Sequence, residues 1–176
     1  MQQALAEPDT LDGFTWSSLM DIAKRILAAE SGIFIAASAD LPHEVATEIA
    51  VTGAPMIHVG HDQDADRVIE EALIAAGIAP RHTLAAGLAE LSDALQRPIV
   101  LLIEAVERYA TDNLLYALKA ARDELNSSAH HGLRLALFGT DTYQLRALRS
   151  HPAAAFYYAE YLDISTSLGE ARSRTL

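Results

Sequence analysis

The most constraining feature of the sequence is a short, wholly apolar run in the middle of the chain, Ile99–Ile103. Pro98 precedes the run and Glu104 follows it, so the stretch is far too short to cross a membrane. Such a run is typical of a parallel β-strand that is buried on both faces. Because ligands bind at the carboxyl ends of strands in open α/β sheets, we expect Glu104 at the mouth of any binding site.

Further apolar runs and helical patterns alternate around this strand. Helices are expected where apolar residues recur three and four positions apart after a capping residue, over residues 16–30, 41–51, 62–76, 81–96, 113–126 and 142–149. Four more strands are expected at residues 33–37, 55–59, 133–138 and 160–164. The alternation predicts an α/β three-layer sandwich around a mostly parallel five-stranded sheet. We expect one domain over residues 14–165, between a flexible leader (1–13) and a polar tail (166–176).

Composition limits the partners that this chain can have. Its net charge is −11, with only two lysines, Lys24 and Lys119. Such an acidic field disfavours broad contact with nucleic acid and with an anionic membrane. The chain has no cysteine, which excludes disulfides and thiolate metal sites. It has no long apolar segment and no N-terminal signal pattern, so a cytoplasmic location is expected.

Residues 91–163 carry a family likeness. They resemble the core of an AAA+ ATPase, a P-loop NTPase class, of the bacterial type related to origin-recognition and transposition ATPases. The likeness rests on three segments, which resemble the Walker B strand, the helix after it and the strand that carries sensor 1: Ile99–Glu107, Leu115–Asn126 and Gly132–Thr140. It implies the strand order 5-1-4-3-2, sensor-1-like positions at Thr140 and Asp141, and side-by-side assembly with other subunits.

The resemblance places a phosphate-binding loop after the first strand, where the chain departs from the family pattern. Such a loop needs glycines for close backbone approach, a lysine for the outer phosphates and a hydroxyl for magnesium. The segment Ser38–Glu44 has no glycine and no lysine, and Asp40 and Glu44 are acidic. Pro42 and His43 occupy the places of the lysine and the hydroxyl residue. We therefore interpret Ser38, Asp40, Pro42 and His43 as a degenerate Walker A region.

The Walker B motif is also incomplete. The family pattern is an aspartate for magnesium followed by a glutamate that activates water. This chain has Glu104 followed by Ala105, so the second carboxylate is missing. Glu107 lies three residues beyond Glu104, at the expected start of the next helix, and is a poor geometric substitute. The resemblance also stops before the helical lid of the family.

Residues at the strand ends allow a different hypothesis. His58 and His61 follow the second strand and could bind zinc or iron together with Asp40 or Glu104. Asp40, Glu104 and Asp141 could likewise form an acidic crevice that binds magnesium or works as acid and base.

A simpler explanation of the same acids is structural. In that interpretation Asp40 and Asp141 cap helices, and Glu104 pairs with a nearby arginine such as Arg108 or Arg134. No metal ligand set is assigned on this basis.

Four aromatic residues gather near the end of the chain: Phe156, Tyr157, Tyr158 and Tyr161. One strand or helix face cannot bury all of them, and tyrosine is enriched at protein interfaces. We expect Phe156 to pack in the core and the others to form a possible interface.

Taken together, these patterns favour a catalytically inactive AAA+-like domain, a pseudo-ATPase without a cofactor. It would act as an interaction, regulatory or assembly module for a protein partner or for further copies of itself. The alternative is a metal- or nucleotide-binding α/β enzyme that uses the acids at the strand ends. Nucleotide binding without hydrolysis is a third possibility, although Asp40 and Glu44 make it electrostatically unfavourable.

Overall fold

The computed structural model describes residues 19–110, 113–127, 129–150, 156 and 158–165. Five strands form one sheet: β1 (Ile33–Ala36), β2 (Met56–Val59), β3 (Ile99–Ile103), β4 (Leu133–Gly139) and β5 (Glu160–Asp163). Their order is β2-β3-β4-β1-β5, and every neighbouring pair is parallel. This is the order 5-1-4-3-2 read from the other edge, so the expected fold class and strand order are confirmed.

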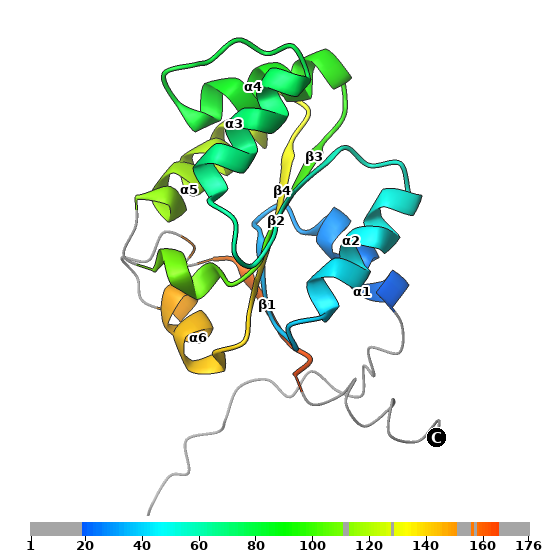
Figure 1. Cartoon of the computed structure of the whole chain (residues 1–176), viewed down its shortest axis with the longest axis vertical. Helices are drawn as coiled ribbons and strands as arrows, with labels where there is room; N and C mark the ends of the chain where they lie inside the picture. The colour runs from blue at the N-terminus through cyan, green and yellow to red at the C-terminus, as the bar shows by residue number, and fades with distance from the viewer. Residues whose placement is uncertain (1–18, 111–112, 128, 151–155, 157, 166–176) are drawn as a thin grey trace, which may run out of the picture.

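Helices cover both faces of the sheet, which Figure 1 shows nearly edge-on between two helical layers. One layer holds α1 (Leu19–Ala28) and α2 (Leu41–Val51). The other holds α3 (Ala65–Ala75), α4 (Leu84–Leu95), α5 (Leu114–Leu125) and α6 (Thr142–Ser150). A single 3₁₀ turn, η1 (Val106–Tyr109), follows β3 directly.

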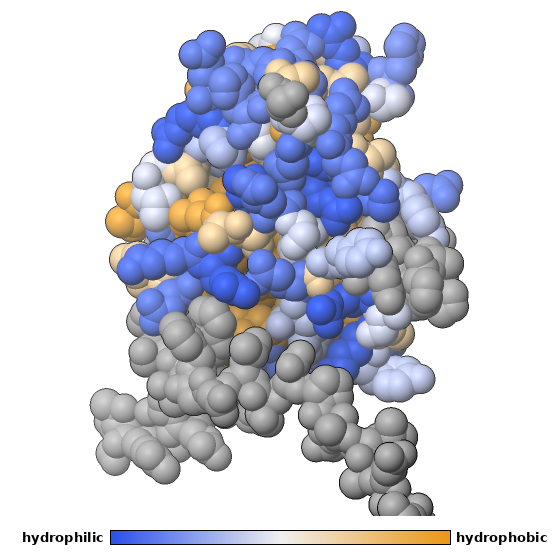
Figure 2. Space-filling view, turned by 180° about the vertical axis from the view of Figure 1, so that it is seen from behind, coloured by the Kyte–Doolittle hydropathy of each residue, from blue (hydrophilic) through white to orange (hydrophobic). Residues whose placement is uncertain are grey.

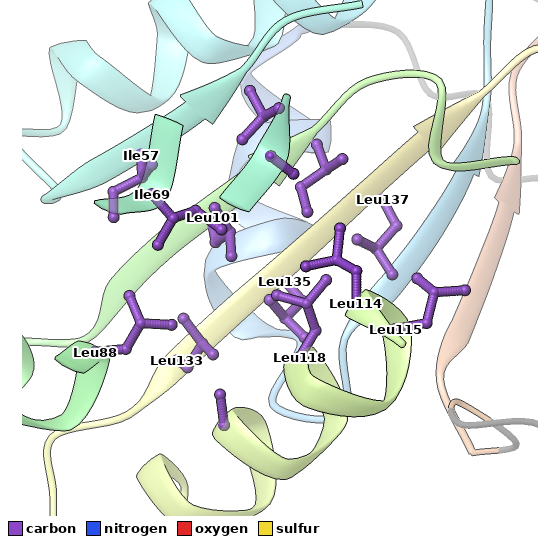
Figure 3. Packing of buried hydrophobic residues seen from close by; sticks show 14 of the residues in the cluster. Ile57, Ile69, Leu88, Leu101, Leu114, Leu115, Leu118, Leu133, Leu135 and Leu137 are labelled. Carbon is purple, nitrogen blue, oxygen red and sulfur yellow. The ribbon is translucent and has the colours of Figure 1, made fainter. Parts of the chain in front are cut away.

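The strands alternate their side chains between the two layers. In β3, Ile99, Leu101 and Ile103 pack with the layer of α3, α4 and α5, whereas Val100 and Leu102 pack with that of α1 and α2. All five β3 residues are fully buried, as expected for a central parallel strand. Figure 3 shows the larger of the two cores, in which leucines of α5 are directed toward leucines of β4.

The helix bounds differ from the predicted ones mainly at two N-termini. Helix α3 begins at Ala65 because Asp64 is its cap and accepts a hydrogen bond from the Arg67 amide at 2.9 Å. Helix α4 begins at Leu84 because Thr83 caps it by accepting from the Ala86 amide at 3.2 Å. The predicted starts at residues 62 and 81 were three residues early. The proposed leader and tail lie outside the described residues.

One face of the molecule is predominantly polar (Figure 2). Seen from behind, hydrophilic residues dominate the face in Figure 2, with smaller hydrophobic areas between them. Among the described residues, no helix combines the length and apolar character that a membrane crossing requires.

Candidate functional site

The candidate site is a shallow hollow of about 20 Å³, room for about one water molecule, at the carboxyl edge of the sheet. Loops that follow β1, β2, β3 and β4 form its walls, which is where the crevice of an open α/β sheet is expected. Most of its lining comes from backbone and small or apolar side chains, with a few polar groups: Ser38, His61, Glu104 and Thr140.

The wall after β1 corresponds to the degenerate Walker A region. The Leu41 amide donates to the Ser38 carbonyl at 3.2 Å, and Pro42 is buried in the first turn of α2 with no amide hydrogen to offer. Asp40 is exposed at the N-cap position but accepts no side-chain capping bond, so its predicted role as a cap is wrong. His43 is exposed, with its ring centroid 6.4 Å from that of His58.

Glu104 is held by the end of β2. Its Oε1 lies 2.7 Å from His58 Nε2, and its Oε2 accepts a hydrogen bond from the His61 amide at 3.1 Å. Both side chains of the His58–Glu104 pair are largely buried, with 24% and 13% of their surface exposed. The predicted arginine partner is therefore wrong. Arg134 instead donates to the Leu27 carbonyl, near the amino end of β4 and far along the strand from Glu104.

Two residues of η1 tie the β2–α3 loop to the end of β3. Arg108 donates from Nη1 to the His61 carbonyl, and the Tyr109 hydroxyl donates to the Gln63 carbonyl at 3.0 Å. Burial raises the pKa of the Tyr109 phenol above its ordinary value of 10.0, although Arg108 beside it acts in the opposite direction. The phenol therefore stays protonated at neutral pH and remains a donor.

Ala105 turns the chain sharply between the two acids. Its φ of 49° and ψ of 46° place it in the left-handed region, which is uncommon for a residue other than glycine. The turn allows η1 to begin at Val106, one residue later. Glu107 therefore lies in the first turn of this 3₁₀ helix, which precedes α5.

Glu107 points toward the loop after β4. Its Oε1 accepts hydrogen bonds from the amides of Thr140 and Asp141, at 2.9 and 3.3 Å, and from the Thr140 hydroxyl at 3.3 Å. Its Oε2 is buried and accepts no hydrogen bond from any residue that the structure describes. A Cβ atom on Gly139 would lie only 2.3 Å from this oxygen, so the carboxylate occupies space that only a glycine leaves open.

Asp141 completes the loop by capping α6. Its Oδ1 accepts a hydrogen bond from the Gln144 amide at 2.9 Å, as the structural interpretation predicted. The sensor-1-like positions Thr140 and Asp141 thus lie beside the hollow, and their amides are directed at Glu107.

The metal hypothesis receives no ligand set from this geometry. His61 is exposed and its Nδ1 lies 3.0 Å from Asp62. In the part of the chain that the structure describes, no three histidine, aspartate or glutamate side chains gather closely enough to hold a metal ion.

The wall after β1 offers few groups that bind phosphate. Pro42 has no amide hydrogen, the Leu41 amide is engaged by the Ser38 carbonyl, and the lining includes the acid Glu104. A phosphate needs several amide donors and a cation at this place.

The aromatic residues near the end of the chain divide as follows. Phe156 is fully buried and meets Phe34 edge-on, with ring centroids 5.7 Å apart. Tyr161 is half-buried, with the Arg146 guanidinium 5.3 Å from its ring centroid. Tyr158 is 83% exposed, and Tyr157 lies outside the described residues. Their role in an interface stays a prediction.

Sequence reasoning missed the His58–Glu104 pair and the clamp formed by Arg108 and Tyr109. A signal for the pair was present, because His58 lies opposite Leu102 in the parallel register. Glu104 is two residues after Leu102 and therefore returns to the same face of the sheet. No sequence signal indicated the clamp, which depends on the turn at Ala105.

Comparisons with known proteins agree with this architecture. The structure is similar to that of a Walker-type ATPase of Pyrococcus abyssi, with a TM-score of 0.56 and 11% sequence identity over 89% of this chain and 55% of the other. It is equally similar to the ADP form of the ORC2 protein of Aeropyrum pernix, with a TM-score of 0.56 and 12% identity over 89% of this chain and 50% of the other.

This chain thus spans about half the length of both neighbours. No protein-family model and no curated protein matches the sequence. The structural likeness shows the fold alone: the domain shares the α/β fold of these two proteins.

Proposed function

We propose that this domain is a catalytically inactive AAA+-like module whose role is to bind another protein or a further copy of itself. One observation carries the proposal. The two acids after β3 are both engaged in holding neighbouring loops, Glu104 by His58 and the His61 amide and Glu107 by the Thr140 and Asp141 amides.

The sequence of the hollow supports the same conclusion. ATP hydrolysis on this fold needs a cation and amide donors for the phosphates, and a carboxylate that activates water. The segment Ser38–Glu44 supplies no lysine and no glycine, and Ala105 replaces the second carboxylate of the motif. The fold is therefore retained while the residues that perform the chemistry are replaced.

The proposal is tested first by nucleotide binding. A ligand at a hundred times its dissociation constant adds about 2.7 kcal/mol to the free energy of unfolding. For a domain of this size that raises the melting temperature by roughly 5–10 °C. We expect no such shift with ATP or ADP in the presence of magnesium, and a clear shift would overturn the proposal.

Phosphate release provides the second test, with a matched pair of variants. We expect no ATP turnover by the wild-type chain, by Glu104→Gln or by Glu48→Gln, which removes a carboxylate from α2. Turnover that is lost in Glu104→Gln and kept in Glu48→Gln would show that the domain is an active ATPase. If turnover were equal in all three proteins, the assay would be repeated after a further purification step. Turnover that disappears on purification would come from a contaminating enzyme.

A further inference from the structure

A second, larger depression lies away from the hollow, between α3 and α4 and the loop that connects them. Its volume is about 260 Å³. Its apolar floor and rim come from one face of α3, the connecting loop and the first turn of α4: Ile69, Leu73, Ile74, Ile78, Leu84 and Gly87. We call this depression the α3–α4 groove. Both helices belong to the same layer and lie at one end of the molecule (Figure 1).

Gly87 explains why the two helices can approach here. A Cβ atom at this position would lie 2.7 Å from Leu73 Cδ1, so the absence of a side chain lets Leu73 rest on α4. Ile69 and Ile78 are buried beneath, whereas Ile74 at the rim is 54% exposed. Ile74 thus extends the apolar surface of the floor outward to the rim of the groove.

The charges along the groove are unbalanced. Asp66 and Glu70 lie one turn apart on the α3 rim, a spacing at which like charges repel along a helix. No ion pair joins either acid to a basic residue among those that the structure describes. Arg67, between them in sequence, lies 3.8 Å from Glu71.

The opposite rim does not compensate these acids. Arg81 is engaged by Glu90, to which its Nε donates at 2.6 Å. The groove therefore presents an apolar floor beside an uncompensated acidic wall.

We infer that the α3–α4 groove is a docking site for a basic amphipathic segment of a partner protein. The inference rests on the proposed binding function and names the chemistry of the partner. Apolar side chains of the segment would cover Leu73 and Ile74, and lysine or arginine residues would face Asp66 and Glu70. From Asp66 to Ile74 the wall is about 12 Å long, at ~1.5 Å per residue, so two helical turns of a partner would fill it.

The test uses the whole chain and three fluorescein-labelled peptides of about 14 residues, ~4 helical turns. One places leucines three and four positions apart with lysines between them, which gives an amphipathic basic helix, one replaces lysine by glutamate, and one replaces leucine by serine. We expect anisotropy to report binding of the leucine–lysine peptide, weaker at high salt, and binding at least about tenfold weaker for the other two. Absence of binding by the leucine–lysine peptide would overturn the inference.

Variants of the protein show whether the groove is the place of binding. The pair Asp66→Asn and Glu70→Gln is expected to weaken binding by about tenfold, because it removes the charges at the rim. The control pair Glu48→Gln and Glu124→Gln changes net charge equally, on α2 and α5, and is expected to have less than about a twofold effect. Equal weakening by both pairs would mean that bulk charge attracts the peptide, and would overturn the inference.

The apolar half of the groove has its own control. Ile74→Ser is expected to weaken binding by about fivefold, whereas Val51→Ser, which removes a 75% exposed valine at the end of α2, is expected to leave it unchanged. Thermal unfolding checks that every variant is folded. If the peptides fail to bind and the protein has no ATP turnover, the docking inference is wrong but the proposed inactive module stands. If the protein turns over ATP and still binds the peptide, the proposal of inactivity is wrong but the docking inference stands.

Discussion

Glu104 and Glu107 both follow β3, yet their side chains bind loops on opposite sides of this strand. Glu104 reaches back to β2 and meets an imidazole and one amide. Glu107 reaches forward to the loop after β4 and meets two amides and a hydroxyl, all on one oxygen. The first acid can form an ion pair with its partner, whereas the second relies on neutral donors.

The difference teaches how this edge of the sheet is closed. Removing a hydrogen-bonding acid takes away the acceptor of its donors, and hydrogen bonds to a charged group contribute about 1.5–3 kcal/mol. Because Glu107 serves more donors and fits against Gly139, we expect the β4 side to be the more sensitive one. The variants below separate the two sides, from the largest expected effect to the smallest.

Gly139→Ala is expected to have the largest effect. Its new Cβ atom would meet Glu107 Oε2 at 2.3 Å and Leu145 Cδ2 at 2.9 Å, so the acid must leave its donors or the loop must shift. We expect a loss of about 2–3 kcal/mol in the free energy of unfolding, measured by urea denaturation.

Gly60→Ala is the control for this substitution. Its Cβ atom would meet only the flexible end of Gln63, at 3.3 Å, and a loss below about 1 kcal/mol is expected. Comparable losses in Gly139→Ala and Gly60→Ala would contradict the assignment of the clash to Glu107.

Glu107→Ala is expected to lose about 2 kcal/mol, because the Thr140 and Asp141 amides lose their acceptor. Glu107→Gln keeps one acceptor oxygen and should lose about half as much. Chemical denaturation of both variants checks this order. If the two variants were equally unstable, the charge of Glu107 and not its acceptor oxygen would be the stabilising feature.

Glu104→Gln is expected to lose about 1 kcal/mol, less than Glu107→Ala, because the amide oxygen of glutamine can still accept from the His61 amide. The interaction that Glu104→Gln weakens is the pair with His58. A double-mutant cycle with His58→Ala measures the coupling energy between the two residues. We expect a coupling energy of about 0.5–1.5 kcal/mol. Additive losses would mean that His58 and Glu104 stabilise the domain independently.

Much of the fold was predictable because its signals are local. The apolar run Ile99–Ile103 and the pattern over residues 41–51 gave the strand and the helix with the bounds that the structure has. Strand order was not encoded by any local pattern; it followed from the resemblance to AAA+ cores, and the structural comparisons confirm it.

The contacts of the site were less predictable, because they depend on one backbone angle. From sequence, Glu104 and Glu107 differ only by position, and nothing marks Ala105 as a left-handed residue. Because the chain turns at Ala105, the Glu107 side chain lies against the loop after β4 and the Arg108 side chain reaches the His61 carbonyl. A pattern of residue types does not predict that turn. The predicted arginine partner for Glu104 was therefore wrong, because the turn directs Arg108 to the His61 carbonyl.

Ala105→Gly probes that turn and is expected to have the smallest effect. Glycine adopts a φ of about +50° without the clash that alanine meets, but it also gains freedom in the unfolded chain, so the net gain in stability should be about 0.5 kcal/mol. Gln96→Gly is the matched control, since Gln96 has a φ of 52° at the end of α4, where glycine is preferred. Similar gains in the free energy of unfolding, measured by urea denaturation, would mean that alanine at position 105 is strained and contributes nothing specific to the turn. A loss in Ala105→Gly beside a gain in Gln96→Gly would mean that the stiffness of Ala105 holds Glu104 and Glu107 toward their opposite partners.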